Sequence, residues 1–268
     1  MSNETPENHA VPVVSADARG SVGIVTMRRP DRLNALTGES MDQLRDSLVD
    51  LGRSDDIGVI VLRGEGRAFC AGLDLKDGRV NPLAADPVEE FHDMLVAGVE
   101  VIWAIRSVPQ PVIAVIQGHA VGAGFALAAA ADLRMIAADA RFSAPFLNLG
   151  MTVGDLGLSW FLPRLIGHGR ATRTFLDAGT IDAETAVKWG LAQEVSADPF
   201  GDALDMAHRL CGLPRYGVRS SKTLINASAG ASLRDHLDSE ARAQVIGALT
   251  KNAVQAMDRA SQRSKEKK

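Results

Sequence analysis

Short runs of apolar, often β-branched residues divide the chain and predict its strands. These runs cover residues 22–27, 57–62, 111–116 and 133–137. Continuous apolar runs of this length are typical of strands that a sheet buries on both faces. The first elements that the sequence predicts are therefore four buried strands.

Between these strands, apolar residues three and four positions apart predict helices over residues 40–51 and 88–105. The buried face of the second helix is expected to hold Phe91, Leu95, Val99 and Ile102. A polar loop is expected over 77–87, and helices over most of the chain after Leu156. Strands that alternate with helices indicate an α/β fold with a parallel sheet and crossover helices.

Two glycine-rich turns follow predicted strands and are candidates for ligand binding. One occupies residues 64–75, and the other, Gly122–Ala123–Gly124, opens an alanine-rich helix. Small residues let a ligand approach the backbone, and the first amides of a helix have no partner within it. Two such amides can hold an oxygen that gains negative charge. The alternative is tight packing at strand-to-helix turns.

The composition and the charge of the chain argue against several classes of protein. The net charge of −4 argues against a nucleic-acid surface, and two cysteines are too few for a disulfide framework. The polar segment 1–10 resembles neither a signal nor a transit peptide, and Gln117, His119 and glycines interrupt the apolar stretch 109–131. We therefore expect a cytoplasmic protein that does not cross the membrane, with disordered ends at 1–10 and 261–268 and no metal site.

A colinear set of motifs then resembles one family. In chain order these are Arg29–Pro30, Leu33–Leu36, Ala68–Leu75, Pro111–Gly118, the Gly122–Gly124 turn with Asp132, Ala140–Phe142, Leu149–Gly150, Pro163–Gly167 and Ala183–Leu191. Over roughly residues 13–230 the chain resembles the enoyl-CoA hydratase/isomerase, or crotonase, superfamily. The resemblance implies a spiral of repeated β-β-α turns over residues 11–200 and a C-terminal helical trimerisation region over 201–260. It also implies a homotrimer or a dimer of trimers.

The resemblance further implies an acyl-CoA substrate, whose coenzyme A is part of the substrate and not a separate cofactor. The backbone amides of Leu73 and Ala123 match the pair that holds the thioester oxygen in this family. Candidate substrate contacts are Asn34, Ala35, Leu36, Ala71, Gly72, Asp74, Leu75, Lys76, Gly122, Ala126, Phe146 and Trp160. Arg28, Arg29 and Arg32 are candidates for phosphate contacts.

The chain differs from the family pattern at the positions of the catalytic acidic residues. Ala126 and Phe146 stand where hydratases of this family carry two catalytic glutamates. Counted back from Pro163–Arg164, Asp155 matches a catalytic aspartate of dienoyl-CoA isomerases and the nucleophile of 4-chlorobenzoyl-CoA dehalogenases. A dehalogenase would also need a histidine where Val99 stands. An aspartate in a glycine-rich loop can also be only a helix cap or turn residue.

These matches leave three functional hypotheses. The first is enoyl-CoA isomerisation or atypical hydration, in which Asp155, walled by Phe146, Leu156 and Trp160, has a raised pKa and moves the proton. The second is a non-catalytic acyl-CoA binding protein that has lost its acids. The third is an acyl-CoA hydrolase or dehalogenase in which Asp155 attacks as a nucleophile.

Overall fold

The computed structural model describes residues 12–77, 86–255 and 257. The ends expected to be disordered, 1–10 and 261–268, and most of the loop expected over 77–87 lie outside these residues. The described part is a mixed α/β fold with two sheets, as the alternation of strand and helix patterns predicts. Within these ranges, no helix is both long and apolar enough to cross a membrane.

The larger sheet has six strands, and the smaller one has three. The order of the larger sheet is β1 (Val14–Arg19), β2 (Val22–Met27), β3 (Val59–Gly64), β4 (Val112–Ile116), β6 (Leu133–Ala137) and β9 (Val195–Ser196). The smaller sheet contains β5 (His119–Val121), β7 (Arg141–Ser143) and β8 (Thr180–Asp182). From β2 to β9 the larger sheet is parallel, and β1 pairs antiparallel with β2, Val14 opposite Met27.

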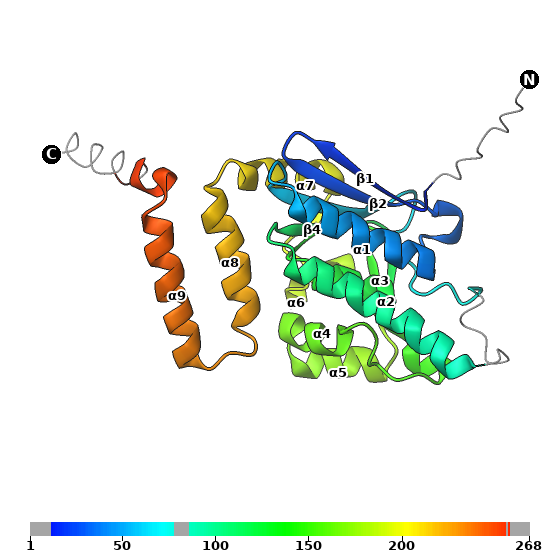
Figure 1. The fold of residues 1–268 in the computed structure, drawn as a ribbon. Helices are drawn as coiled ribbons and strands as arrows, with labels where there is room; N and C mark the ends of the chain where they lie inside the picture. Colours follow the sequence, from blue (N-terminus) through cyan, green and yellow to red (C-terminus); the bar gives the residue numbers. More distant parts are fainter. Residues whose placement is uncertain (1–11, 78–85, 256, 258–268) are drawn as a thin grey trace, which may run out of the picture.

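Helices cover both faces of the larger sheet (Figure 1). In chain order they are α1 (Gly38–Arg53), α2 (Pro87–Ser107), α3 (Ala123–Ala130), α4 (Leu158–Ile166), α5 (His168–Leu176), α6 (Ala183–Trp189), α7 (Pro199–Cys211), α8 (Arg215–Ala227) and α9 (Leu233–Ala248). Two short 3-10 turns, η1 (Pro30–Arg32) and η2 (Pro145–Leu149), complete the named elements.

The strands alternate their side chains between two apolar layers. In β3, Val59 and Val61 pack toward α7, whereas Ile60 and Leu62 join the main core with α1, α2 and α3. Burial on both faces explains why these strands appear in the sequence as continuous apolar runs. The strand predictions at 22–27 and 133–137 are confirmed residue for residue. β1 gave no such signal because, as an edge strand, most of its side chains are exposed.

The prediction for the buried face of α2 was partly wrong. Val99 is 50% exposed, whereas Met94, Gly98 and Val101 are buried with Ile102. The helix carries apolar residues over much of its circumference, so spacing alone does not select the face. Packing against α1 decides it, since these two helices lie side by side (Figure 1).

The C-terminal helices divide into two groups. α7, although it follows residue 200, covers one face of the larger sheet and so packs with the core. α8 and α9 form a hairpin that stands beside the rest of the fold, with α9 farthest out (Figure 1). The helical region expected from residue 201 onward therefore includes one helix that belongs to the core layer.

Candidate active site

The two glycine-rich turns lie close together because residues 69–74, in the first turn, form backbone hydrogen bonds with β5 on one side and with Leu36 on the other. Residues 69–74 run beside β5, where the Val121 amide donates to the Cys70 carbonyl at 2.9 Å. On the other side, the Leu36 amide donates to the Gly72 carbonyl at 2.7 Å. This pairing fixes the first turn against the start of α3.

The contact between the turns is so close that it requires glycine. Gly72 has a φ of 91°, and a β-carbon there would lie 2.8 Å from the Val121 carbonyl oxygen and 3.7 Å from the Ala123 amide nitrogen. Any other side chain would push the turns apart. Among the residues that the structure describes, neither the Leu73 nor the Ala123 amide donates a hydrogen bond. Two unpaired backbone donors from distant segments are thus brought together.

Leu73 and Ala123 both line a cavity of about 470 Å³, a volume in the range of small-molecule sites. It is lined by Ala71, Gly72, Leu73, Leu75, Phe91, Leu95, Val121, Gly122, Ala123, Pro145, Phe146, Leu149, Gly150, Met151, Thr152, Gly154 and Asp155. Of these described lining residues, only Thr152 and Asp155 have polar side chains, and only Asp155 is titratable. The cavity therefore suits an apolar group beside one carboxyl.

The Asp155 carboxyl lies close to the start of α3. A β-carbon built on Gly122 would be 4.0 Å from Asp155 Oδ2 and 3.4 Å from the Phe146 ring. Burial raises the pKa of Asp155 to about 6, and none of the described charged groups contributes to the shift. A carboxyl with this pKa can both accept and donate a proton near neutral pH.

The structure brings together about half of the predicted site residues. Those that line the cavity are Leu73, Ala123, Asp155, Ala71, Gly72, Leu75, Gly122 and Phe146. Those that do not line it are Asn34, Ala35, Leu36, Asp74, Lys76, Ala126 and Trp160. Ala126 is fully buried within α3, so its side chain packs in the core.

Two residues predicted to contact the substrate, Asn34 and Asp74, have side-chain partners within the protein that hold the first glycine-rich turn. Asn34 is buried, and its Nδ2 donates to the carbonyls of Ala68 at 2.8 Å and Glu65 at 2.9 Å. Arg29 pairs with Asp74 at 2.8 Å, and this hydrogen bond holds the pKa of Asp74 below its ordinary value. These side chains stabilise the turn from behind. Their polar groups are already satisfied within the protein.

All three arginines predicted to contact phosphate have carboxylate partners, at different distances. Arg28 pairs with Glu65 at 3.1 Å, and Arg29 with Asp74 as described. Arg32 is half-exposed and lies 3.9 Å from Asp31. Of the three, Arg32 is the cation with the weakest internal pairing.

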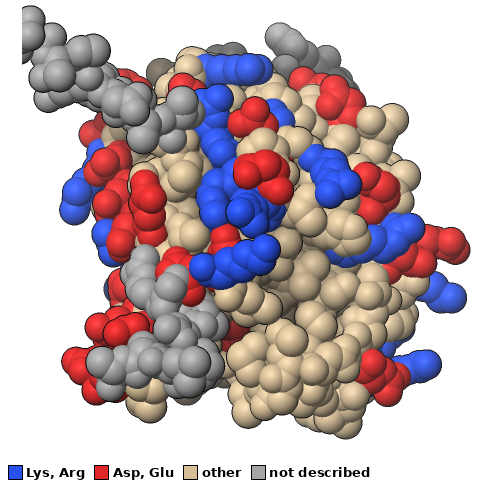
Figure 2. Space-filling model, turned by 90° about the vertical axis from the view of Figure 1, so that its right-hand side faces the viewer, with Lys and Arg blue, Asp and Glu red and all other residues tan. Residues whose placement is uncertain are grey.

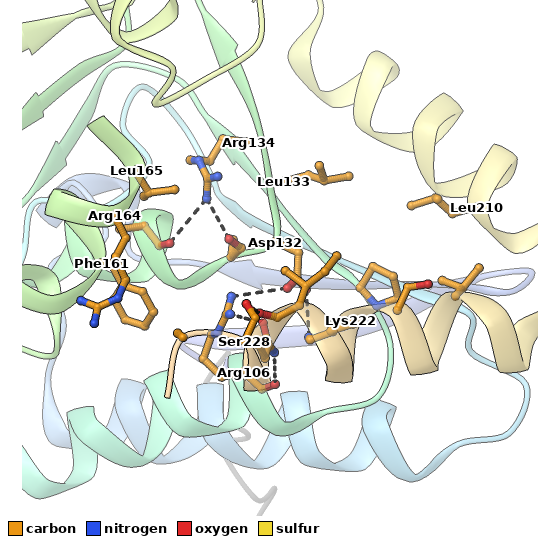
Figure 3. A pocket seen from close by; sticks show the side chains of 18 of the residues that line it. Arg106, Asp132, Leu133, Arg134, Phe161, Arg164, Leu165, Leu210, Lys222 and Ser228 are labelled. Carbon is orange, nitrogen blue, oxygen red and sulfur yellow. Dashed lines mark hydrogen bonds and ion pairs between the residues drawn. The ribbon is translucent and has the colours of Figure 1, made fainter. Parts of the chain in front are cut away.

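Trp160 lies on a different and larger cavity of about 800 Å³, between α8 and the core (Figure 3). Lys222, on α8, donates to the carbonyls of Ile105 and Gln110 at 2.8 Å each and pairs with Asp132 at 2.9 Å. Arg106 also pairs with Asp132, at 3.4 Å. Because the three donors of Lys222 are used, we interpret this cluster as the attachment of α8 to the core.

The cavity-lining residues that sequence reasoning missed come mainly from two places. Phe91 and Leu95, one turn apart on α2, line the cavity and do not pack in the core. The others are Pro145, Leu149, Gly150, Met151, Thr152 and Gly154, which lie in and just after η2. The apolar spacing of α2 was the available signal, but it did not indicate which apolar stripe faces a cavity.

The fold and the paired turns define the crotonase superfamily, and comparisons with known proteins agree. A family model for enoyl-CoA hydratase/isomerase matches residues 17–267. The protein named "Probable enoyl-CoA hydratase EchA12" from Mycobacterium tuberculosis (strain ATCC 25618 / H37Rv) is 35% identical over 254 residues, covering 92% of this chain and 89% of its own. The 1,2-epoxyphenylacetyl-CoA isomerase of Escherichia coli (strain K12) is 36% identical over 223 residues, covering 81% and 82%.

Among solved structures, enoyl-CoA hydratase from Bacillus anthracis superimposes with a TM-score of 0.87 at 27% identity. The alignment covers 94% of this chain and 96% of that one. The chain therefore belongs to the enoyl-CoA hydratase/isomerase family.

Proposed function

We propose that this protein is an enzyme that isomerises enoyl-CoA thioesters, with Asp155 as the group that moves the proton. The observation that carries the proposal is one carboxyl of raised pKa in an apolar cavity that is also lined by Leu73 and Ala123, two residues whose backbone amides are unpaired within the described protein. The names of the family and of both relatives support a CoA thioester as the substrate class.

In this proposal the Leu73 and Ala123 amides bind the thioester carbonyl oxygen. When a proton leaves the α-carbon, negative charge moves onto this oxygen as an enolate forms. Fixed donors that are already oriented stabilise that charge without reorganising. The close approach at Gly72 supports this role because it holds the two turns in a fixed relation.

One carboxyl is sufficient for isomerisation. Ionised Asp155 takes a proton from the α-carbon of a 3-enoyl thioester, and the double-bond electrons shift through the enolate. The protonated carboxyl then returns a proton to the γ-carbon, which yields the 2-enoyl thioester. Atoms and charge balance, and the carboxylate is regenerated for the next cycle.

The same cavity is less suited to hydration by two acids. Phe146 places an aromatic ring at the cavity wall, and Ala126 is buried in α3. Apart from Asp155, Thr152 is the only described lining residue with a polar side chain that could orient a water molecule. We therefore place isomerisation ahead of atypical hydration.

The basic side chains on one face support a place for the CoA phosphates. Lys and Arg gather at the centre of the face in Figure 2, although the whole chain has a net charge of −4. This face includes the start of α2, which borders the cavity (Figures 1 and 2). We propose that the phosphates bind on this face while the acyl group enters the cavity.

The proposal is tested by incubating the protein with a 3-enoyl-CoA and with crotonyl-CoA, followed by mass spectrometry and chromatography. We expect the 3-enoyl-CoA to be converted to a 2-enoyl-CoA of the same mass. A product heavier by one water would establish hydration, and release of free CoA would establish hydrolysis. Binding without any product would establish the non-catalytic alternative, and each of these three outcomes would overturn the proposal.

A further inference from the structure

The residue that follows Asp155 is anchored in a socket on α2. Leu156 is 6% exposed, and its side chain lies against Gly98, in the middle of the helix. A β-carbon on Gly98 would lie 2.7 Å from Leu156 Cδ2, 3.0 Å from Leu156 Cδ1 and 3.2 Å from Met41 Sδ. The socket therefore exists because Gly98 has no side chain.

Glycine within a helix has a cost that its packing here explains. Relative to alanine, glycine in a helix interior loses about 1 kcal/mol. Gly98 is buried, and Leu156 occupies the space that an alanine methyl group would take. The glycine thus makes room for Leu156, although it makes the helix itself less stable than alanine would.

The anchor also determines the direction of the chain at Asp155. Leu156 has a φ of 44°, a conformation that a leucine adopts only when its surroundings impose it. The Leu158 amide donates to the Asp155 carbonyl at 2.9 Å, which closes the turn around Leu156. Leu156 packs against Gly98 of α2 and the turn around it is closed by a hydrogen bond. In this arrangement the Asp155 side chain lies at the cavity, beside Gly122.

We infer that Gly98 is a positioning residue for Asp155: it forms the socket in which Leu156 holds the carboxyl next to the two turn amides. Gly98 acts through Leu156 and is not itself among the residues that line the cavity. The inference rests on the proposed function, in which Asp155 transfers the proton.

The direct test is Gly98→Ala. The added methyl group must displace Leu156, whose flexible end can move without unfolding the helix, and alanine also favours the helix. We expect kcat for 3-enoyl-CoA isomerisation to fall on the order of 10²-fold, since a small misplacement of a catalytic group costs about that much. KM should change little because the displaced group is not needed for binding.

Two comparisons separate this effect from a general disturbance. Gly169→Ala makes the same change in α5, where no atom lies within 4 Å of the new methyl group, and should leave kcat unchanged. Leu156→Ala removes both Cδ atoms and should also lower kcat. In the Leu156→Ala background, Gly98→Ala should have much less effect, because the two Leu156 Cδ atoms are gone and only Met41 Sδ, at 3.2 Å, stays close to the new methyl group.

A second measurement determines the pKa of the Asp155 carboxyl and does not depend on enzyme activity. The wild-type protein and Gly98→Ala are labelled with ¹³C at aspartate Cγ and titrated by NMR, with Asp155→Asn assigning the resonance. Burial raises the pKa of Asp155 to about 6, and Asp155 is the only titratable side chain among the described residues that line the cavity. Displacement toward solvent in Gly98→Ala should lower this pKa toward the ordinary aspartate value.

The outcomes distinguish the inference from the proposed function. If Asp155→Asn is inactive while Gly98→Ala keeps the wild-type kcat and aspartate titration, the positioning role is overturned and the proposed function stands. If Asp155→Asn turns over as fast as the wild type, the proposed function fails and the positioning role fails with it. Loss of kcat with a lowered pKa in Gly98→Ala supports both.

Discussion

Asp155 is the single residue whose replacement should separate catalysis from binding. Asp155→Asn keeps the shape of the side chain but cannot transfer a proton, so kcat should fall by roughly 10²–10⁴. Affinity for an unreactive acyl-CoA, measured by calorimetry, should stay nearly constant. Asp205→Asn, at an exposed position on α7, is the matched control. A rate within a few fold of the wild type would mean that Asp155 is only a turn residue, since asparagine serves such turns equally well.

The raised pKa of Asp155 predicts opposite effects of pH on rate and on stability. As a base it must be ionised, so kcat/KM should fall as the pH drops below about 6. Because its pKa is higher in the folded state than in the unfolded chain, the folded state binds the proton more tightly. The contribution of Asp155 to stability should therefore decrease as the pH rises from about 4 to 6. Thermal unfolding across this range should show that the wild type loses stability relative to Asp155→Asn as the pH rises. Equal slopes would contradict the assignment.

At the scale of elements, the start of α3 supplies a donor that proline can remove. Ala123 is the first residue of the helix, a position where proline is tolerated. Ala123→Pro removes the amide hydrogen, and loss of one such donor costs on the order of 10²–10³ in rate. Steady-state kinetics give the rate, and an unchanged circular dichroism spectrum shows that the fold is intact. Full activity in a folded variant would show that the thioester oxygen is bound elsewhere.

The attachment of α8 to the core is also an element-scale property. Lys222 is 6% exposed, and its pKa is lowered by burial despite its pairing with Asp132. Lys222→Ala should cost on the order of 3 kcal/mol, because it leaves buried carbonyls and a carboxylate short of a partner. Urea unfolding measures the loss. Lys188→Ala, at an exposed position on α6, should change stability by less than about 0.5 kcal/mol. Equal effects of the two substitutions would reject the attachment role.

At the scale of the whole molecule, the α8–α9 hairpin carries apolar surface that one chain leaves exposed. The side chains concerned on and just after α9 are Leu233, Leu237, Val245, Ile246 and Leu249, which are between 49% and 77% exposed. Burying such surface is worth roughly 25 cal/mol per Å². We predict a trimer or a dimer of trimers, with a light-scattering mass three or six times the 28.4 kDa of one chain. Ile246→Glu should weaken the assembly, and a stable wild-type monomer at micromolar concentration would contradict the prediction.

Local sequence patterns were enough to predict most of the strands and the chemistry that the turns can offer. Strands such as 22–27 are recognisable because burial on both faces demands a continuous apolar run, which is a local property. The turns around Gly72 and Gly122 are recognisable because close backbone approach demands small residues. Asp155 was predicted by resemblance, because its place before Pro163–Arg164 matches an aspartate of related enzymes while Ala126 and Phe146 replace the usual glutamates.

Which residues share the cavity depends on long-range packing and could not be predicted from local patterns. Periodicity gave α2 several apolar stripes, and packing against α1 turned Phe91 and Leu95 toward the cavity. Packing elsewhere in the fold places Trp160 on the other cavity, beside α8, and buries Asn34 behind the first turn. The contact of Gly98 with Leu156 joins positions far apart in the chain, and no local pattern encodes such a pairing. Local patterns specify what each segment can form, whereas long-range packing selects the faces that meet.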